Sequence, residues 1–158
     1  MARILPSAIT ASLLLFVSAC LGIDSYGLPT GTVTQQQVLS RPEAHLYYPG
    51  AHVVGSSSAG EVPSSLEGNR PAFAETYLVV SNTSRQRIDD WYAKKLKEAG
   101  WHFDSRNDPN VSYTRGTRES FTIWFFKAAP TGVKWDGTGT LYSIGYQIAP
   151  CSRAGVSC

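Results

Sequence analysis

Residues 83–101 read Thr-Ser-Arg-Gln-Arg-Ile-Asp-Asp-Trp-Tyr-Ala-Lys-Lys-Leu-Lys-Glu-Ala-Gly-Trp, and this stretch decides the fold because it carries the start and one face of a helix. Thr83 followed by Gln86 three residues later matches a capping box, in which side chains satisfy the first free backbone amides. Apolar and aromatic side chains then recur at the three- and four-residue spacing of one helical face. They are Ile88, Trp91, Tyr92, Leu96 and Ala99.

The end of this helix is marked as well. Gly100 stands where a helix commonly adopts its left-handed terminal residue, and Trp101 follows at the position that packs back on Leu96. The pattern therefore predicts one main helix from about residue 84 to residue 99.

Strand patterns lie on both sides of the helix. A short β-rich run, Thr76 to Val80, precedes it, and residues 121–126 are apolar on both faces, as in a central strand. Further alternating runs occupy residues 101–103, 111–113 and 141–149. Short connections predict that the strands flanking the helix are parallel with a right-handed crossover. The later strands, joined by turns, are expected to be antiparallel.

The expected fold class is α+β, with the helix on one face of a mixed, mostly antiparallel sheet of roughly five to six strands. One such domain is expected to occupy residues 44–158. Its first part, Ala44 to Val54, is predicted to form a hairpin or a bend around Pro49-Gly50. Residues 55–71, rich in Ser, Gly, Pro and Glu, are expected to form a loop.

The N-terminus has the pattern of a signal peptide. Arg3 provides the positive charge, residues 8–17 form a short apolar run, and Val17-Ser18-Ala19-Cys20 closes it. The apolar run is shorter than the roughly 20 residues of a membrane-spanning helix. These four residues resemble the lipobox of bacterial lipoproteins, and segments 41–51 and 91–101 are similar to parts of uncharacterised bacterial exported proteins.

The lipobox resemblance implies a cellular location. It implies that residues 1–19 are removed, that Cys20 is acylated, and that the domain lies in the cell envelope, anchored to a bacterial membrane outside the cytoplasm. The membrane lipid attached to Cys20 is then the first expected partner. The alternative is an ordinary signal peptide cut near Ala19, with Cys20 incidental. Residues 20–43 hold glycines, Pro29 and a polar run, so we expect a flexible tether that reaches roughly 25 Å.

The two remaining cysteines, Cys151 and Cys158, are expected to form a disulfide, because disulfides persist outside the cytoplasm and the six residues between them can close a loop. Two free thiols are the alternative. A metal site is not expected, since two sulfurs need two further ligands and no histidine lies nearby in the sequence.

Charge and motifs exclude several functions. Fourteen Lys and Arg face twelve Asp and Glu, which gives no basic excess for a nucleic-acid partner. The serine-rich residues 55–60 miss the spacing of a nucleophile elbow, and Asp89-Asp90 are adjacent on a helix and cannot face one another. We therefore expect neither an enzyme nor a cofactor, although a catalyst can assemble from distant residues.

Aromatic residues near the C-terminus supply the candidate ligand-binding site. Trp124, Trp135, Tyr142 and Tyr146 fall on two neighbouring predicted strands and the loop between them. Tyr and Trp rings suit sugar or peptide ligands if one sheet face is uncovered, whereas core packing from both sides is the alternative. The sequence thus favours a non-catalytic binding or interaction module for an envelope protein, peptide or glycan. The alternatives are a structural accessory subunit of an envelope complex and an envelope hydrolase.

Overall fold

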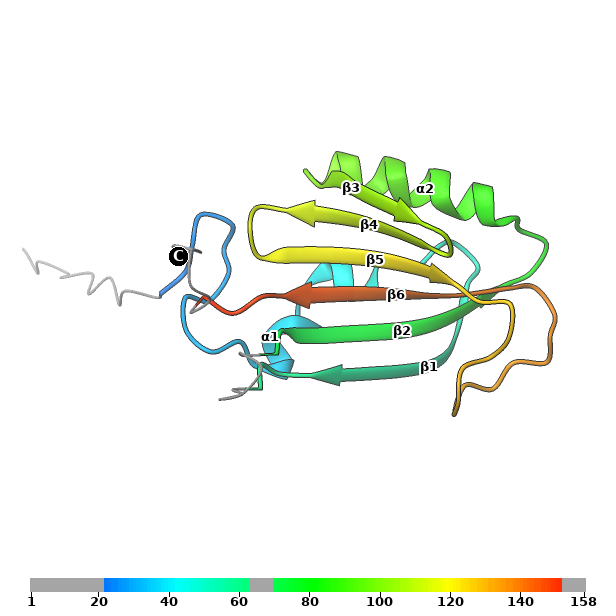
Figure 1. The fold of residues 1–158 in the computed structure, drawn as a ribbon, viewed down its shortest axis with the longest axis horizontal. Coiled ribbons are helices and arrows are strands. Elements are labelled where there is room, and N and C mark those ends of the chain that lie inside the picture. The colour runs from blue at the N-terminus through cyan, green and yellow to red at the C-terminus, as the bar shows by residue number, and fades with distance from the viewer. Residues whose placement is uncertain (1–21, 63–69, 152–158) are drawn as a thin grey trace, which may run out of the picture.

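In the computed structural model, the residues described are 22–62 and 70–151, and their strands form one six-stranded antiparallel sheet (Figure 1). The strand order across the sheet is β1-β2-β6-β5-β4-β3. The strands are β1 His52–Ala59, β2 Ala72–Val80, β3 His102–Asn107, β4 Asn110–Arg115, β5 Glu119–Phe125 and β6 Thr140–Ile148. The helical elements are α1 Gln35–Leu39, the 3-10 helix η1 Pro42–His45, and α2 Arg85–Glu98.

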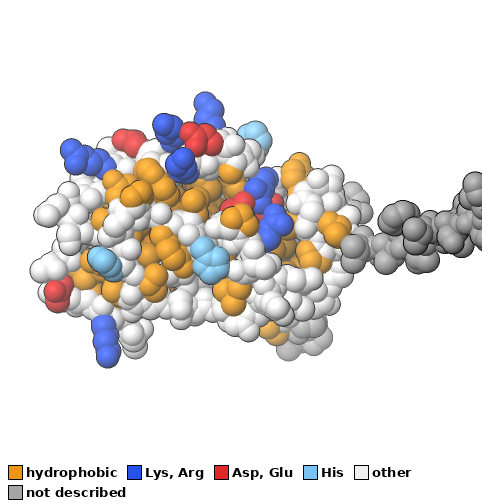
Figure 2. Space-filling model, turned by 180° about the vertical axis from the view of Figure 1, so that it is seen from behind, with side chains coloured by type: hydrophobic (Ala, Val, Ile, Leu, Met, Phe, Trp, Pro, Cys, Tyr) orange, Lys and Arg blue, Asp and Glu red, His pale blue; other side chains and the backbone are white. Residues whose placement is uncertain are grey.

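The helices cover one face of the sheet, and Figure 1 views the molecule from the opposite, open side. Tyr92 of α2 packs against Phe121 of β5 and Tyr142 of β6, with ring centroids 5.7 and 6.2 Å apart. Its hydroxyl also donates to the carbonyl oxygen of Leu46, just after η1, at 2.8 Å. This helix-covered face holds the core, and Figure 2 shows it from behind, with Lys and Arg side chains along the margin where α2 runs.

The main helix has nearly the predicted bounds, but a different residue begins it. Ser84 is the N-cap and accepts from the Arg87 amide, while Thr83 donates to the carbonyl of Ser81. Gln86 donates instead to Asp90 one turn on, so the predicted Thr83–Gln86 capping box is wrong and the helix begins one residue later. The helix ends as predicted: Gly100 has φ of +79°, and the Trp101 amide donates to the Leu96 carbonyl at 2.9 Å.

The fold is mostly β, so the α+β prediction is confirmed only in outline. The predicted mixed sheet is wrong, because all five strand pairings are antiparallel. β2 and β3, on either side of α2, do point the same way, since four successive reversals separate them. They are not neighbours, because β4, β5 and β6 fill the sheet between them.

The region before β2 also differs from the prediction. Pro49-Gly50 forms a turn, but the chain before it is η1 and irregular backbone, so the bend and not the hairpin forms. The expected loop at residues 55–71 begins instead with strand, since β1 continues to Ala59. The serines of β1 pair with β2 through their backbones, which composition alone does not reveal.

The predicted flexible tether is wrong for the residues that the structure describes. Leu28, Val33 and Val38 are buried in the core, and Ile23 forms a bridge with Pro29. Thr34 and Gln37 form a complete capping box at the start of α1. The domain therefore includes residues 22–43. Among the described helices, none is long and apolar enough to cross a membrane.

Candidate functional site

The open face of the sheet carries the candidate site. Strand register sets side chains in rows across the strands, and the central row runs Ser57, Glu75, Gly145, Thr122 and Ser112. On one side of this row stand Tyr77, Ser143 and Trp124, and on the other stand Phe73 and Gln147. The middle of the face is therefore lower than its two aromatic margins.

This arrangement forms a groove of about 450 Å³, which we call the open-face groove. Its lining includes Phe73, Glu75, Asn110, Trp124, Gly145 and Gln147. Gly145 lies at the centre of β6, where the absence of a side chain opens the floor. No backbone requirement explains this glycine: its φ lies outside the left-handed region, and a Cβ there would meet only the Thr122 carbonyl oxygen, at 4.0 Å.

One margin of the groove is built from stacked rings. Trp124 is 43% exposed although it lies in a strand near the middle of the sheet. It stacks on Phe126 at an interplanar angle of 19° and a centroid distance of 6.2 Å. Phe126 in turn contacts Tyr77 of β2, with centroids 5.7 Å apart. The stack holds the Trp124 ring in place, so it offers a fixed apolar surface.

Polar groups cover the rest of the groove. Glu75 accepts a hydrogen bond from Ser143 at 3.0 Å, and Ser112 bonds to Thr122 at 3.3 Å. Burial, together with the nearby Glu75 carboxylate, raises the pKa of Tyr77 above its usual value. Asn110 has a buried side-chain oxygen with no protein partner. Glu75 is the one charged residue among the described lining residues.

The structure separates the four predicted ligand-binding residues. Trp124 lies on the open face, whereas Tyr142 and Tyr146 are fully buried on the helix-covered face. Even-numbered residues of β6 point to the core, so these two tyrosines cannot share a surface with Trp124. Trp135 lies in the loop after β5, where its indole nitrogen donates to the Thr138 carbonyl at 2.7 Å. It lines a separate pocket with His52 and Val79. The predicted site is thus wrong for the two tyrosines.

Sequence reasoning missed most of the groove. Glu75 precedes the run recognised as a strand, and Gly145 was hidden among apolar residues of the last strand. The available signal was the alternation of β2, in which Phe73, Glu75 and Tyr77 occupy every second position.

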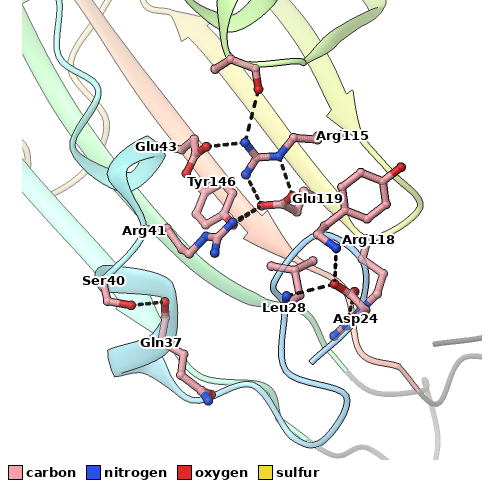
Figure 3. A network of polar contacts seen from close by, with 12 residues as sticks. Asp24, Leu28, Gln37, Ser40, Arg41, Glu43, Arg115, Arg118, Glu119 and Tyr146 are labelled. Atoms are coloured by element: carbon pink, nitrogen blue, oxygen red, sulfur yellow. Dashed lines mark hydrogen bonds and ion pairs between the residues drawn. The ribbon is translucent and has the colours of Figure 1, made fainter. Parts of the chain in front are cut away.

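A buried ionic cluster lies on the other side of the sheet, below η1 (Figure 3). The Glu119 side chain is 0% exposed and accepts two hydrogen bonds from Arg115, each 2.7 Å. It also accepts from the Tyr146 hydroxyl at 2.5 Å, and Glu43 binds the same Arg115 at 2.7 Å. The hydrogen bonds that Arg115 donates to Glu119 raise the pKa of Arg115 above its usual value.

This cluster joins β4, β5, β6 and η1, and the Glu119 side chain at its centre has no exposed surface. Its role is therefore structural. Arg115 also stands over the Trp101 ring, 4.7 Å from the centroid, which extends the link to the end of α2.

Two predictions about the cysteines involve residues outside the described structure. Cys20 and Cys158 lie outside the described residues, so the acylation and the Cys151–Cys158 disulfide stay predictions. Within residues 22–62 and 70–151, no group of three or more His, Cys, Asp or Glu is placed to hold a metal ion.

Comparison with known proteins adds no relative. A scan of family models, a search of curated proteins and a search of solved structures each returned no match.

Proposed function

We propose that this chain is a membrane-anchored lipoprotein of the bacterial envelope that binds a neutral glycan in the open-face groove, without catalysing a reaction on it. The anchor is the acylated Cys20, and the domain formed by the described residues is the binding module. The lipobox pattern supports the anchor, and the geometry of the groove supports the ligand class.

Gly145 carries the argument for a ligand. A glycine inside a strand costs stability, because it gains no side-chain packing and loses more backbone freedom on folding. The fold does not need it here, since a Cβ would have no close neighbour. The position is explained when another molecule approaches the β6 backbone closely. We place a sugar ring between Trp124 and Phe73, with the apolar C–H face of the ring toward the aromatic side chains.

The lining of the groove favours a neutral saccharide. Aromatic margins suit the apolar faces of sugar rings, and hydroxyl and amide side chains suit sugar hydroxyls. The lining residues that the structure describes include no Lys or Arg, so they offer no charge complement to a phosphate or sulfate. Glycoside hydrolysis normally uses two carboxylates, whereas this lining holds only Glu75, which favours binding over hydrolysis.

Calorimetric titration of the detergent-solubilised full lipoprotein tests this proposal. We expect saturable binding of N-acetylglucosamine or glucose oligosaccharides and no preference for a sulfated polysaccharide. Trp124→Ala is expected to weaken binding at least tenfold, whereas Trp135→Ala, a tryptophan change outside the groove lining, leaves it unchanged. Equal losses in both variants, or no saccharide binding at millimolar concentration, would refute the glycan proposal.

The anchor has a separate test. Mass spectrometry of the chain isolated from bacterial membranes is expected to find residues 1–19 removed and lipid on Cys20. An unmodified Cys20 in a chain that still carries Met1 would refute the anchor and leave the groove argument standing.

A further inference from the structure

We infer that the domain rests directly on the phospholipid surface through the end of the sheet where the chain enters. This end, the base, comprises residues 22–30 and the β4–β5 turn, residues 116–118. The inference rests on the proposed lipid anchor at Cys20. It adds a second contact with the bilayer and a fixed orientation of the binding groove.

The first step is the short length of chain between the acylated cysteine and the base. One residue, Leu21, separates Cys20 from Gly22, where the described structure begins. Two successive Cα–Cα steps span at most about 8 Å, so Gly22 cannot lie farther than this from the acylated cysteine. The base must therefore lie at the headgroup layer if Cys20 carries lipid.

The second step is that residues 22–30 cannot unwind into a tether without breaking the hydrogen bonds and the ion pair that hold this loop. Asp24 accepts from the Tyr26 and Leu28 amides, each at 2.9 Å, and binds Arg118 at 3.0 Å (Figure 3). Burial alone would raise the pKa of Asp24, but these hydrogen bonds and the Arg118 charge hold it below its usual value. The Thr30 amide closes the loop on the Gly22 carbonyl at 2.6 Å.

The third step is the chemistry of the exposed side chains on this loop. Ile23 is 50% exposed and Tyr26 is 51% exposed, although both belong to a loop that is held in place. The Tyr26 ring lies over the β4–β5 turn, where a Cβ on Gly116 would come within 2.6 Å of it. An aliphatic side chain beside a tyrosine with a polar tip is the composition that inserts at membrane interfaces.

A neighbouring cation adds to this fit. Arg41 lines a pocket of about 410 Å³ together with Gly22, Ile23 and Pro29 of the base. It is the one charged residue among the described lining residues, and its side chain is 24% exposed. One contact of its guanidinium, at 3.5 Å, goes to Glu119, which leaves other donors for a headgroup phosphate. The base thus presents apolar, amphipathic and cationic groups to the bilayer surface at which the anchor holds it.

Docking in this way sets the height of the groove. Gly145 stands three residues before Ile148, and the amide of the next residue, Ala149, donates to the Arg118 carbonyl in the base at 2.7 Å. At the rise of a strand, the groove centre therefore lies roughly 10 Å from the base. The ligand is then a saccharide presented close to the membrane surface.

Depth-dependent quenching tests the docked orientation. The full lipoprotein is reconstituted in phosphatidylethanolamine–phosphatidylglycerol vesicles containing a spin-labelled lipid. A fluorophore is attached at Ser25→Cys in the base or, as the matched control, at Thr131→Cys in the loop at the opposite end. Both positions are exposed. We expect at least twofold stronger quenching at position 25.

The outcomes separate the two proposals. Equal quenching at both positions in chains that sediment with vesicles would overturn the docking and leave the anchor intact. Chains that lack lipid and stay in the supernatant would overturn both. A Gly-Ser spacer of about 15 residues after Leu21, which reaches roughly 20 Å, is expected to reduce the difference between the positions.

Discussion

Replacement of Gly145 by valine separates stability from binding more sharply than any other change in this chain. The new side chain would stand on the floor of the open-face groove, with the nearest protein atom, the Thr122 carbonyl oxygen, 4.0 Å from its Cβ. The backbone there is not left-handed, so no strain opposes the change. The strand gains a β-branched residue between Glu75 and Thr122, which is expected to raise the free energy of unfolding by about 1 kcal/mol.

The same side chain occupies the space that the proposed saccharide needs. We expect affinity to fall more than tenfold, which corresponds to about 1.4 kcal/mol. Urea unfolding measures the first effect, as a midpoint rise of about 0.5 M at a typical slope, and calorimetric titration measures the second. Gly55→Ala is the control: this glycine also lies in a strand on the open face but outside the groove lining, and its Cβ would meet Tyr77 at an ordinary 3.6 Å. A more stable Gly145→Val protein that binds the saccharide normally would show that the groove is not the site.

Three further changes address the fold. Glu119→Gln is expected to lower the free energy of unfolding in urea by about 3 to 5 kcal/mol, because it leaves the buried Arg115 without its main counter-charge. Glu98→Gln, on the surface, is the control and is expected to cost almost nothing. Similar small effects of both changes would mean that the cluster is not structural. Gly100→Ala is expected to cost about 1 kcal/mol, since its φ of +79° is unfavourable for a residue with a Cβ, and a neutral effect would contradict that conformation. Burial raises the pKa of Tyr92, Tyr142 and Tyr146, that of Tyr142 to about 12. The free energy of unfolding that these neutral tyrosines contribute is therefore fully present below pH 10. It falls as the pH rises above 10, by up to about 1.4 kcal/mol per tyrosine and pH unit. Thermal melts from pH 8 to 11 test this, and an unchanged midpoint would refute it.

Local signals in the sequence were enough for the main helix and for the strands near residues 121–126 and 141–149. Gly100 and the periodic apolar face mark the extent of α2 within its own sequence. The order of the strands was not predictable in the same way, because β6 pairs with β2 residues that lie 60 to 76 positions earlier in the chain. The N-terminal segment was misjudged because Leu28, Val33 and Val38 follow neither a helical nor a strand period, and only tertiary packing buries them.

The candidate site was partly predictable. Trp124 was recognised, and Tyr142 and Tyr146 were correctly assigned to one face of their strand. The sequence does not say which face the helices cover, and this decides between core and site. The sequence does not show that Gly145 lies on the floor of a groove, because this depends on its neighbours across the strands.

The central place of β6 has a consequence for how the protein reaches its final location. β6 lies between β2 and β5, yet it is the last strand of the described chain. Without residues 140–148, the strands of β1–β2 and of β5–β4–β3 have no partner that joins them, and the edges of β2 and β5 stay unpaired. Cooperative folding, dominated by such long-range pairings, must then wait for the C-terminal end. Under the export proposed above, this delay keeps the chain unfolded and able to pass the translocation machinery until nearly all of it has crossed.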